Sequence, residues 1–431
     1  MNHLRVGLAG TGTVGGGVWR HLQSNFDVLC SRTGAEISIT RVATRDPASV
    51  QRLGIPAAFV SDDWRALVND PEIDLVVELI GGTTHAYELI KTALQKGKHV
   101  VTANKALLSK HGEELFALAA KHERQLLFEA SVAGGIPIIK SLREGLIANR
   151  INALYGIING TCNYILTNMA ERGIDYAEAL ADAKAKGYAE ADESLDVDGH
   201  DAAHKAAILA AIAYGFWIPE EHLFTEGIRN VTRLDIQYAR KLGYEIKLLG
   251  IIKSDKSGAV EVRVHPTLVP QKHVLASVNG VFNAIFVQGD VVGDTLFYGR
   301  GAGADATASA VLGDIAEVAL HLPTPRKCRS VGTEALYPKL KTIDEIVSRY
   351  YVRLNVVDQP GVLAKVASIF AAHNIGISSV IQPEGHAGDQ VPLIIMVHDA
   401  PEKHFAAALA EIARLETIKD APVRLRVEDF A

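Results

Sequence analysis

The sequence has few cysteines and no long apolar run. Its three cysteines, Cys30, Cys162 and Cys328, stand far apart, without the spacing of a metal site or a disulfide framework. No segment approaches the roughly 20 consecutive apolar residues of a membrane helix, and the N-terminus shows no apolar signal-peptide core. These absences argue against a secreted or membrane-spanning protein and predict a reduced, cytoplasmic enzyme. We therefore interpret the glycosylation sequon Asn159-Gly160-Thr161 as a chance match.

A strong excess of charge of one sign is also missing. The chain has 44 Lys and Arg against 50 Asp and Glu, a net charge of −6. Nothing therefore favours nucleic acid or an anionic membrane surface as a partner. With 431 residues, 48% of them hydrophobic and 22% charged, the chain has the composition of a globular protein with roughly two to four domains.

Short β-rich runs alternate with helical segments over roughly the first 130 residues. The runs span 4–10, 37–44, 75–82, 99–105 and 125–131. This alternation is typical of βαβ units. It predicts an α/β fold with a Rossmann-type, doubly wound parallel sheet in a nucleotide-binding domain of residues 1–133.

The pattern changes after this domain. Residues 134–320 mix long amphipathic helices with strand-like runs, which predicts an α+β domain for substrate binding, catalysis and dimerisation. Its last part, 301–320, is a glycine-led, alanine-rich helix that we expect to pack back on the nucleotide domain. We interpret 321–348 as a linker. Residues 349–431 have the order βαββαβ, which is a ferredoxin-like arrangement.

A glycine-rich loop follows the first predicted strand and opens a helix. Gly10, Gly12 and Gly15 have the GxGxxG spacing. The first glycine allows a tight turn, the second lets backbone approach a pyrophosphate, and the third lets helix and strand pack. With Thr13 and Val14 they would place phosphates at a helix N-terminus. In this context the motif predicts dinucleotide binding rather than a purely structural turn.

The choice of cofactor depends on the end of the second strand, where Arg45 and Asp46 stand. A carboxylate there would bind a ribose 2′-hydroxyl, whereas an arginine suits a 2′-phosphate. We predict a preference for NADP(H), with NAD(H) and a plain surface role for Arg45 as the alternatives.

Two further strand ends are expected at the same edge of the sheet, where open parallel sheets bind ligands. Gly81 and Gly82 follow the third run and leave space for a flat ring, while Thr102 and Lys105 stand at the end of the fourth. Lysines after strands are usually solvated. The mouth of a nucleotide crevice, however, makes Lys105 a candidate functional residue.

Glu129 ends an apolar run, where an unpaired carboxylate is costly to bury. Together with carbonyls of the irregular segment that follows, it could hold a cation. A helix-capping or turn role explains it equally well.

Six carboxylates and a closing lysine fall within GYAEADESLDVDGHDAAHK, residues 187–205. A calcium EF-hand loop needs a glutamate six residues after its glycine, but Lys205 occupies that position after Gly199. No His or Cys spacing here suits zinc. We interpret three of the acids as parts of a solvated bend: Asp192, Glu193 and Asp198.

Asp201 and Lys205 differ from the rest of this run. Asp201 falls in the first turn of the next predicted helix, where the helix dipole favours a carboxylate. Lys205 lies four residues on, over the same face. Because the rest of that helix is almost wholly apolar, Lys205 needs a carboxylate partner, and burial suits it to acid/base work. A structural buried ion pair is the alternative.

These motifs resemble the homoserine dehydrogenase family across essentially the whole chain. The similar segments are GLAGTGTVGGGV, ELIGG, VTANKALL, FEASVAGGIPII, GIINGTCNYIL, GYAEADESLDVDGHDAAHK and GRGAGADATASAV. DQPGVLAKVASIFAAHNIGISSV resembles an ACT domain, a module that typically binds amino acids. The resemblance implies a monofunctional enzyme that interconverts aspartate 4-semialdehyde and homoserine with NAD(P)H, on the route to threonine, methionine and isoleucine.

The resemblance also implies roles for particular residues. Glu190, Asp196 and Asp201 match acidic substrate positions, which suits the α-ammonium group of the substrate. Lys205 matches the proposed acid/base, and Lys105 matches a second catalytic or substrate-orienting lysine. The other matches are cofactor-contacting backbone at Gly187 and Gly303, and a monovalent cation site (Na⁺ or K⁺) formed by Glu129 with the carbonyls of Val132, Gly134 and Ile136.

The ACT-like unit implies feedback control, which we expect threonine to exert. Asp358, Gly361 and Asn374 stand at the strand–helix junction and the helix end where such effectors bind. A module that serves assembly alone is the alternative. The expected partners are the small-molecule substrate, a threonine effector and further copies of the chain in a homodimer or homotetramer. A non-catalytic, dinucleotide-bound amino-acid sensor is the alternative function, although the retained lysines and acids argue against it.

Overall fold

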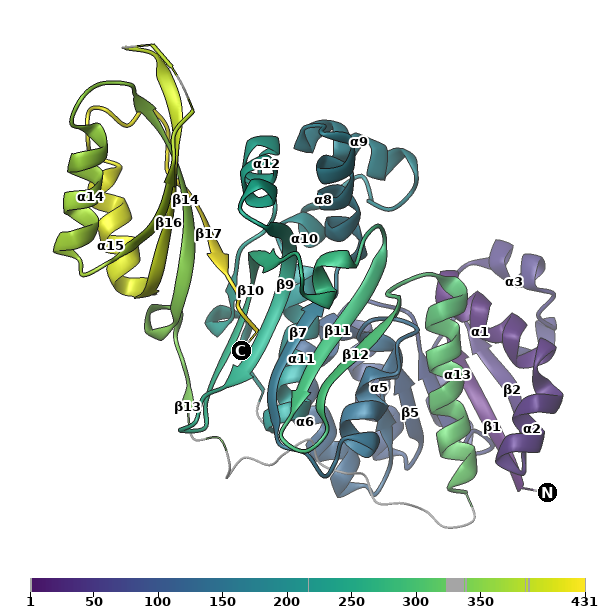
Figure 1. The fold of residues 1–431 in the computed structure, drawn as a ribbon. Coiled ribbons are helices and arrows are strands. Elements are labelled where there is room, and N and C mark those ends of the chain that lie inside the picture. Colours follow the sequence, from purple (N-terminus) through teal and green to yellow (C-terminus); the bar gives the residue numbers. More distant parts are fainter. Residues whose placement is uncertain are drawn as a thin grey trace. The chain divides into compact units, whose positions relative to one another are not determined.

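The computed structural model describes residues 2–215, 217–322, 337, 339–383, 385–386 and 388–430. They form two compact units, and Figure 1 shows the fold coloured along the chain. The first unit comprises Met1–Ile158, His204–Leu223 and Phe282–Pro338, and the second comprises Asn159–Ala203, Phe224–Val281 and Lys339–Ala431. Much of the expected linker 321–348, with Cys328, lies outside the described residues. Within the described ranges, no helix has the length and apolar character needed to cross a membrane.

The first unit contains a parallel sheet of six strands in the order β3-β2-β1-β4-β5-β6. The strands are β1 (Asn2–Ala9), β2 (Ala35–Ala43), β3 (Val60–Ser61), β4 (Leu75–Glu78), β5 (His99–Thr102) and β6 (Leu126–Leu127). Strands buried on both faces form near-continuous apolar runs, and this is why the sequence identified five of them. The predicted doubly wound α/β fold is confirmed, with the two-residue β3 as an unpredicted addition.

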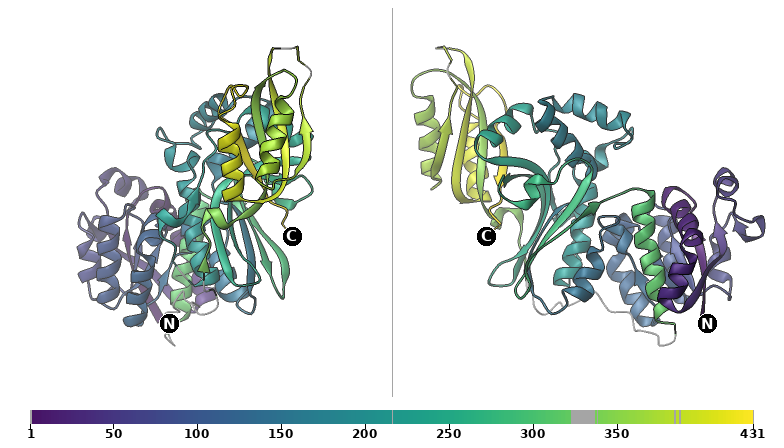
Figure 2. Two further views of the ribbon diagram at one scale, coloured as in Figure 1. Left: turned by 90° about the vertical axis from the view of Figure 1, so that its left-hand side faces the viewer. Right: turned by 45° about the vertical axis from the view of Figure 1, so that its right-hand side comes forward.

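Helices connect these strands, and the longer ones bury apolar side chains. They are α1 (Thr13–Ser24), α2 (Phe26–Thr33), α3 (Pro47–Leu53), α4 (Arg65–Asn69), α5 (Thr84–Gln95) and α6 (Lys105–Lys121). A helix from much later in the sequence, α13 (Ala304–Leu320), lies beside α1 (Figure 2). A Cβ at Gly17 would lie 2.9 Å from the carbonyl oxygen of Ala304. Val311 and Ile315 of α13 therefore share one core with Leu4 and Val18.

The rest of the first unit includes three antiparallel strands: β7 (Ile151–Ile157), β11 (Phe282–Gly289) and β12 (Gly293–Arg300). A short helix, α7 (Ile138–Lys140), and a π-helical turn (Ser141–Gly145) precede β7. Most of α11 (His200–Tyr214) also belongs to this unit. Most side chains of α11 are buried, as its apolar sequence predicts.

The second unit contains helices and a long antiparallel pair. The helices are α8 (Gly160–Arg172), α9 (Tyr176–Ala185), α10 (Ser194–Val197) and α12 (Arg233–Lys241). The pair consists of β9 (Tyr244–Ser254) and β10 (Ala259–Pro270), and the short strands β8 (Phe224–Thr225) and β13 (Lys339–Leu340) flank β10.

The C-terminal domain has the order βαββαβ, as predicted. Its elements are β14 (Val347–Val357), α14 (Val362–Ala372), β15 (Ile377–Ile381), β16 (Gln390–Pro401), α15 (Glu402–Ile412) and β17 (Val423–Val427). The strand order is β17-β14-β16-β15. Strand β17 also pairs in parallel with β10, where Thr267 faces Arg426. The C-terminal sheet therefore continues into the β9–β10 pair.

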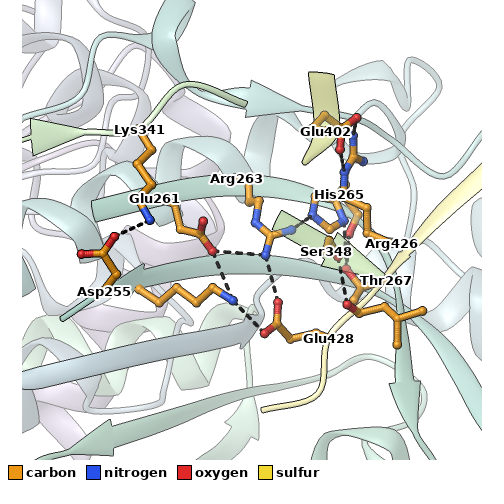
Figure 3. A network of polar contacts seen from close by, with 12 residues as sticks. Asp255, Glu261, Arg263, His265, Thr267, Lys341, Ser348, Glu402, Arg426 and Glu428 are labelled. Carbon is orange, nitrogen blue, oxygen red and sulfur yellow. Dashed lines mark hydrogen bonds and ion pairs between the residues drawn. The ribbon is translucent and has the colours of Figure 1, made fainter. Parts of the chain in front are cut away.

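Buried charges accompany this junction (Figure 3). Arg263 on β10 and Arg426 on β17 are each 1% exposed. Arg263 pairs with Glu428 at 2.9 Å, and Arg426 pairs with Glu402 of α15 at 2.7 Å. Charges at such depth are tolerated only when they are paired, so the two strands join in one specific arrangement.

Candidate active site

The glycine-rich loop joins β1 to α1 by packing backbone against backbone. A Cβ at Gly10, whose φ is +97°, would lie 2.4 Å from the carbonyl oxygen of Leu79. A Cβ at Gly15 would lie 2.0 Å from the carbonyl oxygen of Gly10. Neither position accepts a side chain. At Gly12 nothing lies within 4 Å of the Cβ position, so the loop leaves room there for a pyrophosphate at the start of α1.

A cavity of about 480 Å³ adjoins this loop. It is lined by the loop itself and by the ends of β2 and β4, with Arg45 and Asp46 on the β2 side. Asp46 caps α3, since its Oδ1 accepts the amides of Ala48 and Ser49 at 3.1 and 3.2 Å. The Asp46 carboxylate is thus engaged, whereas Arg45 is exposed at the cavity.

A buried glutamate, Glu78, organises the ends of β4 and β5. Its Oε1 accepts the amides of Ile80 and Gly81 at 3.0 and 3.1 Å, and its Oε2 accepts the Thr102 hydroxyl at 2.6 Å. Burial raises the pKa of Glu78, and these hydrogen bonds oppose that rise. The sequence interpretation missed Glu78. A lone carboxylate within the apolar run LVVELIGG is the signal that would have identified it.

Lys105 is the first residue of α6, next to its N-cap Asn104. The Asn104 side chain accepts the amide of Leu107 at 3.1 Å and donates to the carbonyl of Gly82 at 2.7 Å. Gly81 and Gly82 have φ of +72° and +70°, and no atom lies within 4 Å of a Cβ built on either. The helix dipole opposes a lysine at this end. Such a local cost is characteristic of functional residues.

Two of the predicted substrate carboxylates, Asp196 and Asp201, meet at one amide. Nδ2 of Asn159 donates to Asp196 at 2.7 Å and to Asp201 at 2.9 Å. The hydroxyl of Thr161 lies 3.1 Å from the other oxygen of Asp196. Asn159 is itself held, because its Oδ1 accepts the amide of Cys162 at 2.8 Å and caps α8. The two carboxylates are therefore fixed side by side by a buried side chain.

Asn159 and Thr161 are thus part of the site, although the sequence interpretation treated them as a chance glycosylation sequon. Asn159 is 4% exposed. A usable signal was its place at the junction between an apolar strand and an apolar helix in GIINGTCNYIL, where a polar side chain must cap or bind.

The other acids of the run fall into two groups. Glu190 and Asp192 are exposed, and within the described ranges Glu190 makes no hydrogen bond or ion pair. Arg229 pairs with Glu193 at 3.2 Å and with Asp198 at 2.5 Å. Glu193 and Asp198 are thus partly exposed, in keeping with a solvated bend, but both are ion-paired, which that interpretation did not include. Their partner Arg229 comes 31 residues after Asp198, so the run itself holds no sign of it.

Lys205 is buried on α11, one helical turn after Asp201. Its Nζ donates to the carbonyl oxygen of Ile158 at 2.7 Å. Ile158 immediately precedes Asn159. The ammonium group is therefore fixed in position by the end of a strand rather than extended into solvent, as an acid/base residue requires.

Gly187 and Gly303 both stand where a helix meets a loop. Gly187 follows α9 with φ +72°, and Gly303 precedes α13 with φ +115°. Nothing lies within 4 Å of a Cβ at either position. The conformation requires glycine at both, and both leave open space beside the backbone.

The carboxylate of Glu129 caps a helix. Its two oxygens accept the amides of Ile139 and Lys140 at 2.9 and 2.8 Å. Burial raises the pKa of Glu129 and raises that of neighbouring Asp314 to about 8. Lys140 is paired with Asp314 at 3.8 Å and with Glu317 at 3.0 Å. Three carboxyl groups therefore gather around one ammonium group.

The segment from Val132 to Ile136 forms a tight buried turn. Ala133 and Gly134 adopt successive left-handed conformations with φ of +55° and +53°. A Cβ at Gly134 would lie 2.5 Å from the carbonyl oxygen of Gly301. Across the described ranges, no three His, Cys, Asp or Glu side chains form a group that could hold a metal ion. A cation at this turn would therefore depend on main-chain carbonyls, which are the oxygen ligands that hard cations accept.

The three candidate effector residues lie at the two ends of α14. Asp358 accepts a hydrogen bond from Gln382 at 3.0 Å. Gly361 is the N-cap of α14 with φ of +90°, and Asn374 follows the C-cap residue with φ of +59°. All three are at least partly exposed, so a small ligand can reach them.

The parallel sheet, its glycine-rich loop and the adjoining cavity are those of a dinucleotide-dependent oxidoreductase. A family model described as homoserine dehydrogenase, NAD binding domain, matches residues 10–129, and one described as homoserine dehydrogenase matches 137–316. A third, described as ACT domain, matches 350–417. The chain belongs to the homoserine dehydrogenase family, as an NAD(P)-dependent oxidoreductase with a C-terminal ACT domain.

Individual relatives cover the chain from end to end. Homoserine dehydrogenases of Pseudomonas aeruginosa and Neisseria gonorrhoeae are 46% and 43% identical, each over 100% of both chains. A homoserine dehydrogenase structure from Thiobacillus denitrificans is 44% identical with a TM-score of 0.94, over 100% of this chain and 99% of that one. A hyperthermophilic archaeal homoserine dehydrogenase in complex with NADPH is 26% identical with a TM-score of 0.64, over 75% and 100%. These matches give no support to a non-catalytic sensor.

Proposed function

We propose that the protein interconverts L-aspartate 4-semialdehyde and L-homoserine with NAD(P)H in the cytoplasm, on the route to threonine, methionine and isoleucine. The observation that carries this proposal is the pair Asp196 and Asp201 on the single amide of Asn159. Both substrates carry an α-ammonium group. Two carboxylates that are already fixed bind such a cation through charge-assisted hydrogen bonds without reorganising.

Each predicted residue then has a chemical role. The bound dinucleotide supplies the hydride that is exchanged with the substrate carbon. Lys205 holds the proton at the substrate oxygen, donating it in reduction and accepting it in oxidation. Lys105 orients the substrate or assists that transfer. Glu190, exposed on the loop that precedes α10, joins Asp196 and Asp201 on the substrate ammonium.

The test is oxidation of homoserine by the purified protein with NADP⁺, followed through the absorbance of NADPH. L-Serine, which shares the ammonium and hydroxyl groups but is one carbon shorter, is the matched substrate control. Turnover of homoserine with little or none of L-serine supports the proposal. A folded protein that binds NADPH but oxidises neither would contradict it.

Arg45 is proposed to select NADP(H), because it lines the cavity while Asp46 is occupied as a helix cap. Arg45→Ala should raise the KM for NADPH by roughly tenfold or more, the reach of one charge-assisted hydrogen bond. The KM for NADH should change little, since NADH has no 2′-phosphate. Steady-state kinetics with both cofactors measure this. Arg52→Ala, which removes an exposed arginine from α3, is the control, and an unchanged NADPH to NADH preference in Arg45→Ala would refute the assignment.

The buried turn at residues 132–136 is proposed to hold a monovalent cation through the carbonyls of Val132, Gly134 and Ile136. The excess of buried carboxyl groups around Glu129 supports this, because a nearby cation offsets their charge. Since the Glu129 carboxylate already accepts two amides, it would act mainly by charge.

Sodium or potassium should therefore stabilise the folded protein. After exhaustive dialysis, adding NaCl or KCl is expected to raise the Tm by a few degrees through preferential binding to the folded state. Choline chloride at equal ionic strength is the control for general salt effects. Identical melting curves in all three salts would leave Glu129 as a capping residue only.

Threonine is proposed to bind the ACT domain near Asp358, Gly361 and Asn374 and to inhibit the enzyme. Calorimetry should detect threonine binding to wild type, and Asp358→Ala should weaken it at least about fivefold, the lower end of typical allosteric couplings. Homoserine oxidation should slow on threonine titration in wild type and less so in the variant. No threonine binding by wild type would assign the domain to assembly alone.

The active form is proposed to be a homodimer or homotetramer. Support comes from the edge strand β12 and its hairpin, which expose Val291, Val292, Leu296 and Tyr298. An apolar strand that pairs on one side only among the described residues invites pairing with another chain.

A further inference from the structure

The segment Phe224–Arg229, FTEGIR, contacts the acidic run of residues 187–205. The C-terminal half of the segment makes this contact. Arg229 holds Glu193 and Asp198, which flank α10 on its two sides. The amide of Ile228 donates to the carbonyl of Val197 at 2.8 Å. Because α10 itself carries Asp196, the segment borders the carboxylate pair that we assign to the substrate.

The backbone of the segment is closely packed against α10. A Cβ at Gly227 would lie 2.0 Å from the carbonyl oxygen of Val197 and 2.4 Å from Cα of Asp198. Lys184 and Arg229 together lower the pKa of Glu193 to about 2, so Glu193 stays charged and paired with the segment. A shift of 227–229 must therefore move α10, since close-packed backbone cannot absorb it.

The N-terminal half of the same segment contacts the ACT domain. Arg426 of β17 donates to Glu226 at 3.2 Å and to Glu402, the first residue of α15, at 2.7 Å. Its guanidinium also lies 4.6 Å from the centre of the Phe224 ring. The amide of Glu226 is fixed to the carbonyl of Val264 on β10 at 2.8 Å.

From these contacts we infer that the 224–229 segment couples the ACT domain to Asp196 and Asp201, the two carboxylates proposed to bind the substrate. Arg229 is a positioning residue that holds α10, and Arg426 shares its charge between Glu402 on the ACT side and Glu226 on the segment. Because a buried guanidinium is costly to leave without a carboxylate, a shift of α15 or β17 redistributes Arg426 between these two partners. The segment then carries that change to α10. This inference rests on the proposed function, in which α10 contributes to substrate binding.

The first experiment tests the positioning role of Arg229. Arg229→Ala should raise the KM for homoserine roughly tenfold, within the range of coupled contacts, and leave the KM for NADP⁺ within about twofold. Arg229→Lys, which restores one charge but not the forked geometry, should recover part of the loss. Equal effects on both KM values, or none on homoserine in a folded protein, would overturn the positioning role.

The second experiment tests transmission from the ACT side. Glu226→Gln removes the charge that faces Arg426. This substitution should change the homoserine KM at least about threefold, although Glu226 lies outside the acidic run 187–205. Arg353→Lys is the matched control, because Arg353 also joins the ACT domain to the rest of its unit, through Asp235 of α12 at 2.6 Å. The control should leave the homoserine KM within about twofold, with thermal unfolding of both variants confirming that they are folded.

A double-mutant cycle of Glu226→Gln and Arg229→Ala completes the test. Coupled residues give non-additive changes in the homoserine KM, whereas independent ones give additive changes. Additive effects, or an equal effect of Arg353→Lys, would overturn the coupling. Absence of homoserine turnover in wild type would instead refute the proposed function, so the two failures are distinguishable.

Discussion

Lys205→Ala is expected to lower kcat/KM for homoserine by roughly 10²-fold or more, the usual contribution of general acid–base catalysis. The loss follows from geometry as well as charge. The Nζ atom of Lys205 is buried and hydrogen-bonded to the Ile158 carbonyl. Bulk water therefore cannot readily reach the substrate oxygen to replace this ammonium group as the proton donor. Steady-state kinetics in both directions measure the effect.

A cavity in a buried helix can also impair folding, so a second variant separates chemistry from packing. Lys205→Met keeps the unbranched stem and fills similar space but has no ammonium group. We expect Lys205→Met to retain dinucleotide binding and a cooperative thermal transition while losing activity as Lys205→Ala does. Near-wild-type turnover in a folded Lys205→Met protein would show that Lys205 serves only as a structural partner.

Lys105→Ala is expected to produce a loss of similar size, again roughly 10²-fold in kcat/KM for homoserine. Lys105 is the first residue of α6, where the helix dipole disfavours its charge, and it lies beside the Gly81–Gly82 loop. Its removal should therefore cost no helix stability, so unfolding would not explain the loss of activity. The division between kcat and KM identifies its role. A loss confined to KM indicates substrate orientation, and a loss in kcat indicates a part in proton transfer.

Lys110→Ala provides the control, because Lys110 is exposed on the same helix. It should leave both kcat and KM within about twofold. If Lys105→Ala behaves like Lys110→Ala, Lys105 is an ordinary solvated lysine at the end of a strand.

Much of the fold could be predicted because its signals are local. Apolar runs at β1, β4 and β5 and the glycine spacing after β1 predicted the parallel sheet and its nucleotide loop. The βαββαβ order likewise predicted the C-terminal domain. The short strand β3 carries too few residues to show a period. The pairing of β10 with β17 could not be foreseen either, since strand partners distant in the chain leave no local pattern.

The site was predictable to the extent that each residue violates a local rule. Lys205 in an apolar helix and the acids crowded before it are costly unless they bind something. Glu78 breaks a rule in the same way and was overlooked. Arg229, by contrast, breaks none, because an arginine in a polar segment needs no explanation until its partners Glu193 and Asp198 are seen beside it.

The sequence by itself therefore determined the elements, the nucleotide loop and the kinds of side chain available for chemistry, since periodicity, glycine spacing and the cost of burying charge all act within a few residues. Only the tertiary structure decided which of the acids in 187–205 work together. In the fold, Asp196 and Asp201 both accept hydrogen bonds from one buried amide. Glu193 and Asp198 are paired with Arg229 instead, and Glu190 is exposed. That division depends on partners from distant parts of the chain, because a carboxylate's role is set by the donors and charges that surround it in space.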